Sequence, residues 1–405
     1  MTDESRLRVL LAINQKLGAS LDAREDLSFI VESVHSVIPY DCAEIYVSNP
    51  DNGSVSCVAG RNSSRLDQLE LTLEKVGGMV RKALETGEAI LVENMSLPEK
   101  ATRSQLTVPI LNQEKVLGAF NLESNRPDGF NRQDLEWLSV VASQAAISLA
   151  KAAIYQGMVE KRRLGEQLRI ARDVQLSLLP TGAPTLSGLD LSGIYIPSEE
   201  IGGDYFDFIP IVEGHLGIVI ADVVGKGIPA SLIMASFRAF LRAEIRNNYA
   251  IRTIFAKVNN LLKEWLKDNQ FVSAFYGVLD IGRRRLTYSS AGHHPAILLR
   301  DDGRRRYLSS GGPVLGILAG AGYNERFIDL LPGDILVLYT DGVVETESVE
   351  GEMFERERLE TFVRAHGMLG ARELCEQIYA ELSRFSGRAQ PEDDTTIVIA
   401  KVPGT

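Results

Sequence analysis

The sequence is poor in the residues that build disulfide scaffolds and zinc sites. It has three cysteines in 405 residues, Cys42, Cys57 and Cys375. They are too far apart to form a CxxC pair or a His/Cys cluster, so the pattern excludes both a disulfide framework and a zinc-finger type of site. We expect each cysteine to be a buried or partly buried thiol.

A surplus of positive charge is also missing. The formal net charge is −11, which argues against a nucleic-acid-binding surface because such a surface needs clustered Lys and Arg. Two short basic runs, Lys161-Arg162-Arg163 and Arg283-Arg284-Arg285, flank acidic or apolar sequence. We interpret both runs as solvated faces.

Long apolar runs are absent from the sequence as well. The N-terminal stretch MTDESRLRVL is charged and lacks the apolar centre of a signal peptide. No run approaches the roughly 18 apolar residues that a membrane-spanning helix needs. The sequence therefore predicts a cytoplasmic protein with no membrane partner.

Residues 1–150 have the pattern of one α+β domain. The length of the chain suggests two or three domains. Asn131 is a suitable N-cap for a long helix, with Asp134 in its first turn. The pair SQLTVPIL and KVLGAFNLES, split by Asn112-Gln113, predicts a hairpin. The other expected elements are helices over 6–17 and 27–37 and strands over 43–48, 54–60 and 89–94.

This order of elements resembles a GAF domain, a small sensor fold. The resemblance rests on the VPI…VLGAFNLES hairpin and on the start FNRQDLE of the following helix. Neither the Asn–Lys–Asp motif of cyclic-nucleotide-binding GAF domains nor a bilin-attaching cysteine is evident. Two readings stay open: a sensor for a small-molecule ligand, and a dimerising module that binds nothing.

Residues 151–182 are predicted to be a helical linker. No proline occurs from Leu138 to Leu179, and Leu178-Leu179-Pro180 ends the helix because proline cannot continue it. The heptad positions predict a coiled coil with polar and glycine defects and hence a homodimer; the alternative is a single helix packed on its own domain. Position a holds Ile147, Ile154, Lys161, Leu168 and Gln175, and position d holds Ala150, Gly157, Leu164, Ala171 and Leu178.

Residues 183–405 are richer in strand patterns. Many short apolar runs with helices between them predict a β-sandwich flanked by helices. Helices are expected from Pro229, taken as the first helical residue, to Ile245, and over 251–267 and 371–385. The expected strands are 189–197, 203–211, 215–222, 272–281, 285–292, 295–300, 334–341 and 395–402.

Carboxylates stand at the ends of these strands. The apolar runs GIVIAD and ILVLYTD end in Asp222 and Asp341, Asp393 and Asp394 precede TTIVIA, and GGDYFD places Asp204 after two glycines. Any single aspartate at a strand end needs no explanation beyond turn chemistry. Several of them brought together would repel one another unless hard cations bound between them.

The set GGDYFD, ADVVGKG, YTDGVVE and EDDTT resembles the catalytic domain of the PPM (PP2C-like) serine/threonine phosphatases, in the bacterial SpoIIE/RsbU-like branch. The motifs occur in the order of that family, and SAGHHPAILLR and GGPVLGIL between them match its pattern. The resemblance covers residues 183–405. Eukaryotic relatives have a Glu before the aspartate of the first motif. Here Gly203 stands at that position, as is typical of the bacterial branch.

The resemblance implies a metal-dependent hydrolase with two Mn²⁺ or Mg²⁺ ions that activate a water. It implies that Asp222 bridges the ions and is catalytic together with Asp204, and that the Val223 carbonyl completes one shell. Asp341 and Asp393 would each bind a metal, with Asp394 as the alternative to Asp393. The implied substrate is a phosphorylated STAS-type partner protein.

A regulatory element is also implied by the resemblance. The segment PASLIMASFRAFLRAEI, which begins at Pro229-Ala230, resembles the switch helix of the family. We hypothesise that the linker, which ends at Leu178-Leu179, pushes on this helix and so sets metal occupancy. His293 and His294, in SAGHHPA, are interpreted as turn residues rather than as proton donors.

Two rival functions differ in class. GGDYF is similar to the GGDEF signature of a diguanylate cyclase, but Tyr205 stands where a cyclase has Glu, and the acidic partners all lie downstream. A degenerate phosphatase domain that only captures its partner is the other rival. All four acidic motifs are present, which favours the enzyme.

Overall fold

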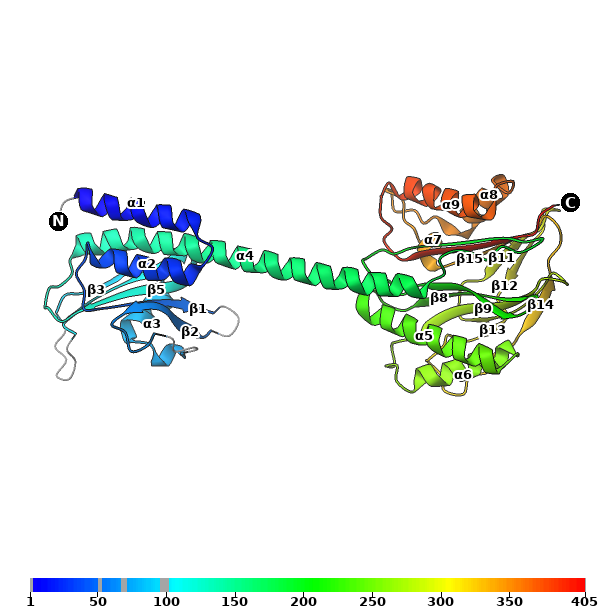
Figure 1. The fold of residues 1–405 in the computed structure, drawn as a ribbon, viewed down its shortest axis with the longest axis horizontal. Helices are drawn as coiled ribbons and strands as arrows, with labels where there is room; N and C mark the ends of the chain where they lie inside the picture. Colours follow the sequence, from blue (N-terminus) through cyan, green and yellow to red (C-terminus); the bar gives the residue numbers. More distant parts are fainter. Residues whose placement is uncertain (1–2, 50–52, 67–70, 95–101, 405) are drawn as a thin grey trace. The chain divides into compact units, whose positions relative to one another are not determined.

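The computed structural model describes residues 3–49, 53–66, 71–94 and 102–404. The chain divides into two compact units, residues 1–164 and 165–405. Figure 1 shows the elements of each unit. One helix, α4 (Arg132–Leu178), contributes its first part to unit 1 and its last part to unit 2.

Unit 1 is built around one antiparallel sheet with the strand order β2-β1-β5-β4-β3. In Figure 1, α1, α2 and the first part of α4 lie on one side of the sheet and α3 on the other. The helices are α1 (Asp3–Ala19), α2 (Ala23–His35) and α3 (Gly78–Thr86), with a 3-10 turn η1 (Leu73–Lys75). The strands are β1 (Cys42–Ser48), β2 (Val55–Arg61), β3 (Ile90–Val92), β4 (Ser104–Asn112) and β5 (Lys115–Ser124).

The sides of this sheet differ in chemistry because neighbouring residues of a strand point to opposite faces. Ile45, Phe120 and Leu122 pack with the helices in one apolar core. On the other face, Glu44 is buried and accepts hydrogen bonds from the hydroxyls of Tyr46 and Ser63. The same face also carries a second, smaller apolar cluster in which Tyr46 packs with Val80 and Ala83 of α3, so buried polar and apolar groups share this side of the sheet.

Helix α4 begins as predicted. Asn131 Oδ1 accepts from the Asp134 backbone N–H, and Asp134 Oδ2 accepts from the Asn131 backbone N–H, each at 3.1 Å. These reciprocal bonds form a capping box. Among the described residues α4 is the one helix long and apolar enough, by length and composition, to cross a membrane. Its residues Leu138 and Val141 are buried in the core of unit 1, as in the core helix of a folded domain.

The end of α4 belongs to unit 2. Gln175 and Leu178, predicted to lie in a coiled-coil seam, are placed elsewhere: Gln175 is 5% exposed, and Leu178 packs with Leu179 against an apolar cluster that includes Ala230. Ile147 and Ile154, further upstream, remain exposed. The coiled coil itself stays a prediction.

Unit 2 contains two β-sheets whose strands pair mostly in antiparallel orientation. The first has the order β13-β10-β9-β8-β7, with β14 also paired to β10, and the second has the order β12-β11-β15-β16-β6. The first sheet comprises β7 (Tyr205–Val212), β8 (His215–Val223), β9 (Val272–Asp280), β10 (Arg285–Ala291), β13 (Gly311–Gly312) and β14 (Arg326–Asp329). The second comprises β6 (Asp190–Ile196), β11 (Ala296–Leu299), β12 (Arg305–Leu308), β15 (Ile335–Tyr339) and β16 (Thr395–Lys401).

The two sheets pack face to face with helices outside, as the sequence pattern predicts. Phe206, Phe275, Leu338 and Val398 meet in the core between the sheets. Figure 1 shows α5 and α6 over one sheet and α8 and α9 over the other. The helices are α5 (Gly227–Asn247), α6 (Ile251–Lys263), α7 (Asp341–Val344), α8 (Glu355–Ala365) and α9 (Ala371–Ser386).

Several expected boundaries are wrong. The hairpin turn of unit 1 consists of Gln113-Glu114, because β4 includes Asn112. Helix α5 begins at Gly227, two residues before Pro229; the φ of 69° at Gly227 turns the chain into the helix. Helices α3 and α8 and strands β12 to β14 were not expected.

Candidate active site

The first acidic motif is held in a crowded loop before β7. A Cβ atom on Gly202 would lie 1.9 Å from Asp394 Oδ2, and one on Gly203 would lie 2.8 Å from the Val223 carbonyl oxygen. Neither glycine has a positive φ. Both residues are therefore glycine because there is no room for a side chain, rather than because the backbone bends unusually.

Asp204, which follows these glycines, is almost completely buried, with 1% exposure. Its Oδ2 accepts from Thr340 Oγ1 at 2.8 Å and from Thr396 Oγ1 at 2.6 Å. Its Oδ1 is buried and has no hydrogen-bond partner among the described residues. Burial, and then the nearby Asp222 carboxylate, raise the pKa of Asp204 well above its usual range.

Asp222 lies near the end of β8, where it pairs with Ser273 of β9. Burial, and then the charges of Asp341 and Asp393, raise the pKa of Asp222 from 3.8 to about 7. Val223, the next residue, is buried, and its carbonyl oxygen borders Gly203.

Asp341 begins the short helix α7, directly after β15. Burial, and then the charge of Asp393, raise its pKa. Its Oδ1 accepts from the Gly342 backbone N–H at 2.8 Å. A Cβ atom on Gly342 would lie 2.1 Å from the Asp394 carbonyl oxygen, so the TDG turn packs directly on the EDD segment.

The two adjacent aspartates have different surroundings. Both oxygens of Asp394 are engaged: Oδ1 accepts from the Ser198 backbone N–H at 2.8 Å and Oδ2 from that of Gly203 at 2.6 Å. Asp393 has a side chain 48% exposed, and its Oδ1 lies 3.2 Å from Lys226 Nζ. Asp394 therefore fastens the first loop, whereas the charge of Asp393 raises the pKa of both Asp222 and Asp341.

Asp207 does not join this group. Its Oδ2 accepts from the Tyr205 hydroxyl at 2.6 Å and pairs with the guanidinium of Arg242, on α5, at 2.6 Å and 2.9 Å. This partly buried ion pair fastens α5 to β7. The first motif thus supplies one carboxylate to the centre and one to the scaffold.

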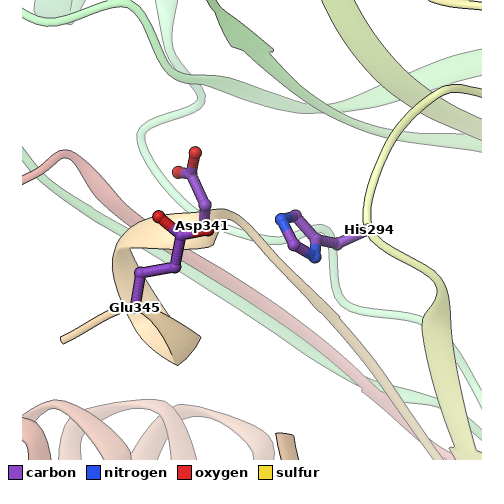
Figure 2. Close-up of side chains that lie close together, drawn as sticks. All are labelled: His294, Asp341 and Glu345. Carbon is purple, nitrogen blue, oxygen red and sulfur yellow. The ribbon is translucent and has the colours of Figure 1, made fainter. Parts of the chain in front are cut away.

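The two adjacent histidines, His293 and His294, also have different surroundings. His293 is buried, its Nδ1 lies 2.8 Å from Ser273 Oγ, and burial, then His294, lower its pKa to about 3. Its surroundings fit the predicted structural role. His294 instead lies with Asp341 and Glu345, as Figure 2 shows; one ligand atom of each lies within 4.8 Å of the others. The sequence analysis missed Glu345 and this placement of His294, although Glu345 stands one helical turn after Asp341.

The residues at this centre fit divalent cations. Asp204, Asp222, Asp341 and Asp393 come from four separate segments. The charge of Asp222 raises the pKa of Asp204, and the charge of Asp393 raises the pKa of both Asp222 and Asp341, which means that these negative charges repel. A buried carboxylate oxygen without a partner is costly unless a cation binds it. Oxygen donors suit Mg²⁺ and Mn²⁺, and the imidazole of His294 is a donor at the edge of the set.

Comparison with known proteins adds independent findings. A family model described as Stage II sporulation protein E (SpoIIE) matches residues 212–403, and a GAF domain model matches residues 20–150. The chain is 30% identical over 242 residues to phosphoserine phosphatase RsbU of Bacillus subtilis, covering 60% of this chain and 71% of RsbU. It is 28% identical over 330 residues to Protein IcfG of Synechocystis, covering 72% of this chain and 51% of IcfG.

A solved structure agrees with the fold of unit 2. The SiaA-PP2C domain of Pseudomonas aeruginosa aligns with a TM-score of 0.53 and 21% identity, over 60% of this chain and 98% of that domain. At this identity the likeness concerns the fold. The chain spans about two thirds of the length of RsbU and about half of that of IcfG.

Proposed function

The chain belongs to the SpoIIE/RsbU-like branch of the PPM (PP2C-like) protein phosphatases and carries a GAF domain, and we propose that it hydrolyses phosphoserine or phosphothreonine on a partner protein in a metal-dependent reaction. The observation that carries the proposal is the convergence of Asp204, Asp341 and Asp393 on Asp222, together with a buried Asp204 oxygen that has no hydrogen-bond partner among the described residues. Such a cluster is stabilised by cations and is poorly suited to a purely structural role.

Each carboxylate has a distinct place in the proposed centre. Asp222, Asp341 and Asp393 would hold the Mn²⁺ or Mg²⁺ ions. The unpartnered Oδ1 of Asp204 and the Val223 carbonyl oxygen would be further donors. Because both oxygens of Asp394 already accept hydrogen bonds, we choose Asp393 as the ligand and Asp394 as the residue that positions the first loop.

Residues around the proposed centre hold its carboxylates in position. When bound, two divalent ions lower the pKa of water and offset charge on the phosphoryl oxygens. The hydroxyls of Thr340 and Thr396 fix the Asp204 carboxylate, since both donate to its Oδ2. Gly202 and Gly203 let the first loop approach Asp394 and Val223 closely. The phosphoester oxygen is displaced in line by water, so no residue of the chain becomes phosphorylated.

The proposed substrate is a phosphorylated STAS-type protein in a cytoplasmic partner-switching pathway. The supporting observation is the family relationship to phosphoserine phosphatase RsbU. The GAF domain is proposed to receive a small-molecule or protein signal. Exposed Ile147 and Ile154 suit a homodimer seam in the linker upstream of unit 2.

Regulation is proposed to act through the end of α4. Gln175 Nε2 donates to the Gly202 carbonyl at 2.6 Å, and Gln175 Oε1 accepts from the Gly202 N–H at 3.3 Å. Leu178 and Leu179 pack with Ala230 of α5, four residues after Lys226 and one after Pro229. A shift of the linker would therefore move both the GGD loop and the proposed switch helix.

Replacing Gln175 with leucine tests this coupling. We expect the apparent Mn²⁺ affinity, read from the activity titration, to fall roughly tenfold, as for other residues that position metal ligands. Ser177→Ala is the matched control, because Ser177 is exposed and bonds only within its own helix. An unchanged titration curve for Gln175→Leu would remove the coupling from the proposal.

The proposed function is tested by phosphate release from para-nitrophenyl phosphate by the full chain, with and without Mn²⁺. Activity that requires Mn²⁺ and is lost in Asp222→Asn, but kept in the exposed-turn control Asp302→Asn, supports the phosphatase. A folded chain without activity at any Mn²⁺ concentration supports the partner-capturing rival. Formation of a cyclic dinucleotide from GTP would support the cyclase instead.

A further inference from the structure

A cavity adjoins the proposed centre on the side of α9. It has a volume of about 190 Å³ and includes Asp393 and Glu345 in its wall. Asp393 belongs to the proposed metal set, and Glu345 lies one turn after Asp341 on α7. The cavity therefore continues the active site rather than forming a separate pocket.

One face of α9 and the segment after it build the cavity. Tyr379, Leu382, Ser383 and Ser386 are spaced by three or four residues, so they share a helix face. Gly387 then ends the helix in the left-handed conformation, with φ 66°. This turn directs residues 388–393 back over the cavity toward β16.

The segment over the cavity is fastened at both ends. Lys226 Nζ donates to the Glu392 carbonyl at 2.7 Å and lies 3.2 Å from Asp393 Oδ1. Arg388 forms an ion pair with Glu392, and its backbone N–H donates to Ser386 Oγ at 3.3 Å. The cavity is thus preformed, which reduces the ordering cost of binding a substrate there.

The charges of the wall favour a cationic occupant. Three carboxylates line the cavity, and two of them, Asp393 and Glu392, are paired with its cations Lys226 and Arg388. Glu345 is exposed and forms no ion pair with the described residues. Leu382 adds apolar surface, which suits the aliphatic stem of a long basic side chain.

On the basis of the proposed function, we infer that this cavity is a specificity subsite that receives a lysine or arginine side chain flanking the phosphoserine of the protein substrate. The stem packs against the α9 face, and the cationic head reaches Glu345. With the phosphoryl group at the ions that Asp341 and Asp393 would hold, a neighbouring residue of an extended chain lies one Cα step of about 3.8 Å away, and its side chain enters the cavity.

The test compares phosphoserine peptides whose flanking residues are all Lys, all Ala or all Glu, using the full chain with Mn²⁺. We expect kcat/KM to be roughly fivefold higher for the Lys peptide than for the Ala peptide, the effect of one partly exposed ion pair, and lowest for the Glu peptide. Ser383→Trp, which fills the cavity, should abolish this preference when kcat/KM for each peptide is taken relative to the variant's own turnover of para-nitrophenyl phosphate. Gln377→Trp, at an exposed position of α9 outside the lining, is the control.

A second variant keeps the inference testable if Ser383→Trp folds poorly. Arg388→Ala leaves Glu392 without its ion pair, so the preference for the Lys peptide should increase. The inference is overturned if the wild-type chain does not distinguish the peptides, or if neither variant alters the preference. A wild-type chain that hydrolyses neither the small ester nor any peptide would instead remove the proposed function, and this inference with it.

Discussion

Replacing Asp222 with asparagine should abolish activity and, in the metal-free protein, stabilise unit 2 above neutral pH. Burial and the charges of Asp341 and Asp393 raise the folded-state pKa of Asp222 to about 7, against an ordinary value of 3.8. The folded state therefore binds more protons than the unfolded state between these pH values. Stability is accordingly lost as the pH rises through about 7, and the loss is absent below about 4.

The size of this stability change follows from the difference between the folded-state pKa of Asp222 and its ordinary pKa. A pKa difference of about 3 corresponds to about 4 kcal/mol at roughly 1.4 kcal/mol per unit. That value is a ceiling, because Asp204 and Asp341 share the same repulsion and can take up the proton in place of Asp222. We therefore expect Asp222→Asn to raise the free energy of unfolding of unit 2 by about 1–3 kcal/mol at about pH 8.

Urea unfolding in the presence of a chelator measures this effect. Fluorescence of Trp265 reports on unit 2 when Trp137, in unit 1, is replaced by phenylalanine. The stabilisation should disappear at about pH 4. With Mn²⁺ the order should reverse, because ions that bind only the folded wild-type protein stabilise it.

Two results would refute the reasoning. One is equal stability of the wild-type protein and Asp222→Asn at about pH 8 without metal; the other is a difference that does not vary with pH. The control is Asp302→Asn. Asp302 is exposed, and the Arg304 side chain lowers its pKa, so this variant should be slightly less stable than the wild type above pH 4, the opposite sign.

Further predictions follow from the different roles of the carboxylates in and around the site. Asp207→Asn should destabilise unit 2 by about 1–2 kcal/mol, because it removes the charge that pairs with the partly exposed Arg242 guanidinium; Mn²⁺ affinity measured by calorimetry should not change. Asp393→Asn should weaken Mn²⁺ binding by more than about 100-fold and Asp394→Asn by about tenfold, and the reverse order would exchange their roles. Removal of metal by a chelator should abolish phosphatase activity, and excess Mn²⁺ should restore it; activity that persists in the chelator would contradict metal dependence.

The elements that could be predicted from sequence are those with strong apolar periodicity. Strands β8, β15 and β16 are continuous apolar runs because both of their faces are covered, one by the opposing sheet and one by helices. Helix α3 was missed because Gly77 and Gly78 stand at its start, where they read as a turn. Helix α8 was missed because the stretch ERERLETFVRA is mostly charged, although Leu359 and Val363 lie one turn apart and are buried.

The acidic motifs were predictable as a set but not in their separate roles. Asp204 lies in the loop before β7 and Asp207 lies on β7, so strand alternation does not relate the two side chains; the structure separates them by their partners, with Asp207 paired to Arg242. Likewise, no pattern in the sequence separates Asp393 from Asp394, since their difference depends on hydrogen bonds from Ser198 and Gly203, nearly two hundred residues away in the sequence.

Gln175 shows most clearly where sequence reasoning about this chain stops. A polar residue at position a of a heptad is compatible with a coiled-coil seam, where it fixes register, and equally with a contact to the helix's own domain. The structure places Gln175 on Gly202 and the neighbouring Leu178 and Leu179 in the core beside α5. Those residues cannot also face a second helix, so a dimer seam has to end upstream of them. A signal that passes along such a seam would then reach the GGD loop through Gln175, which is already hydrogen-bonded to Gly202.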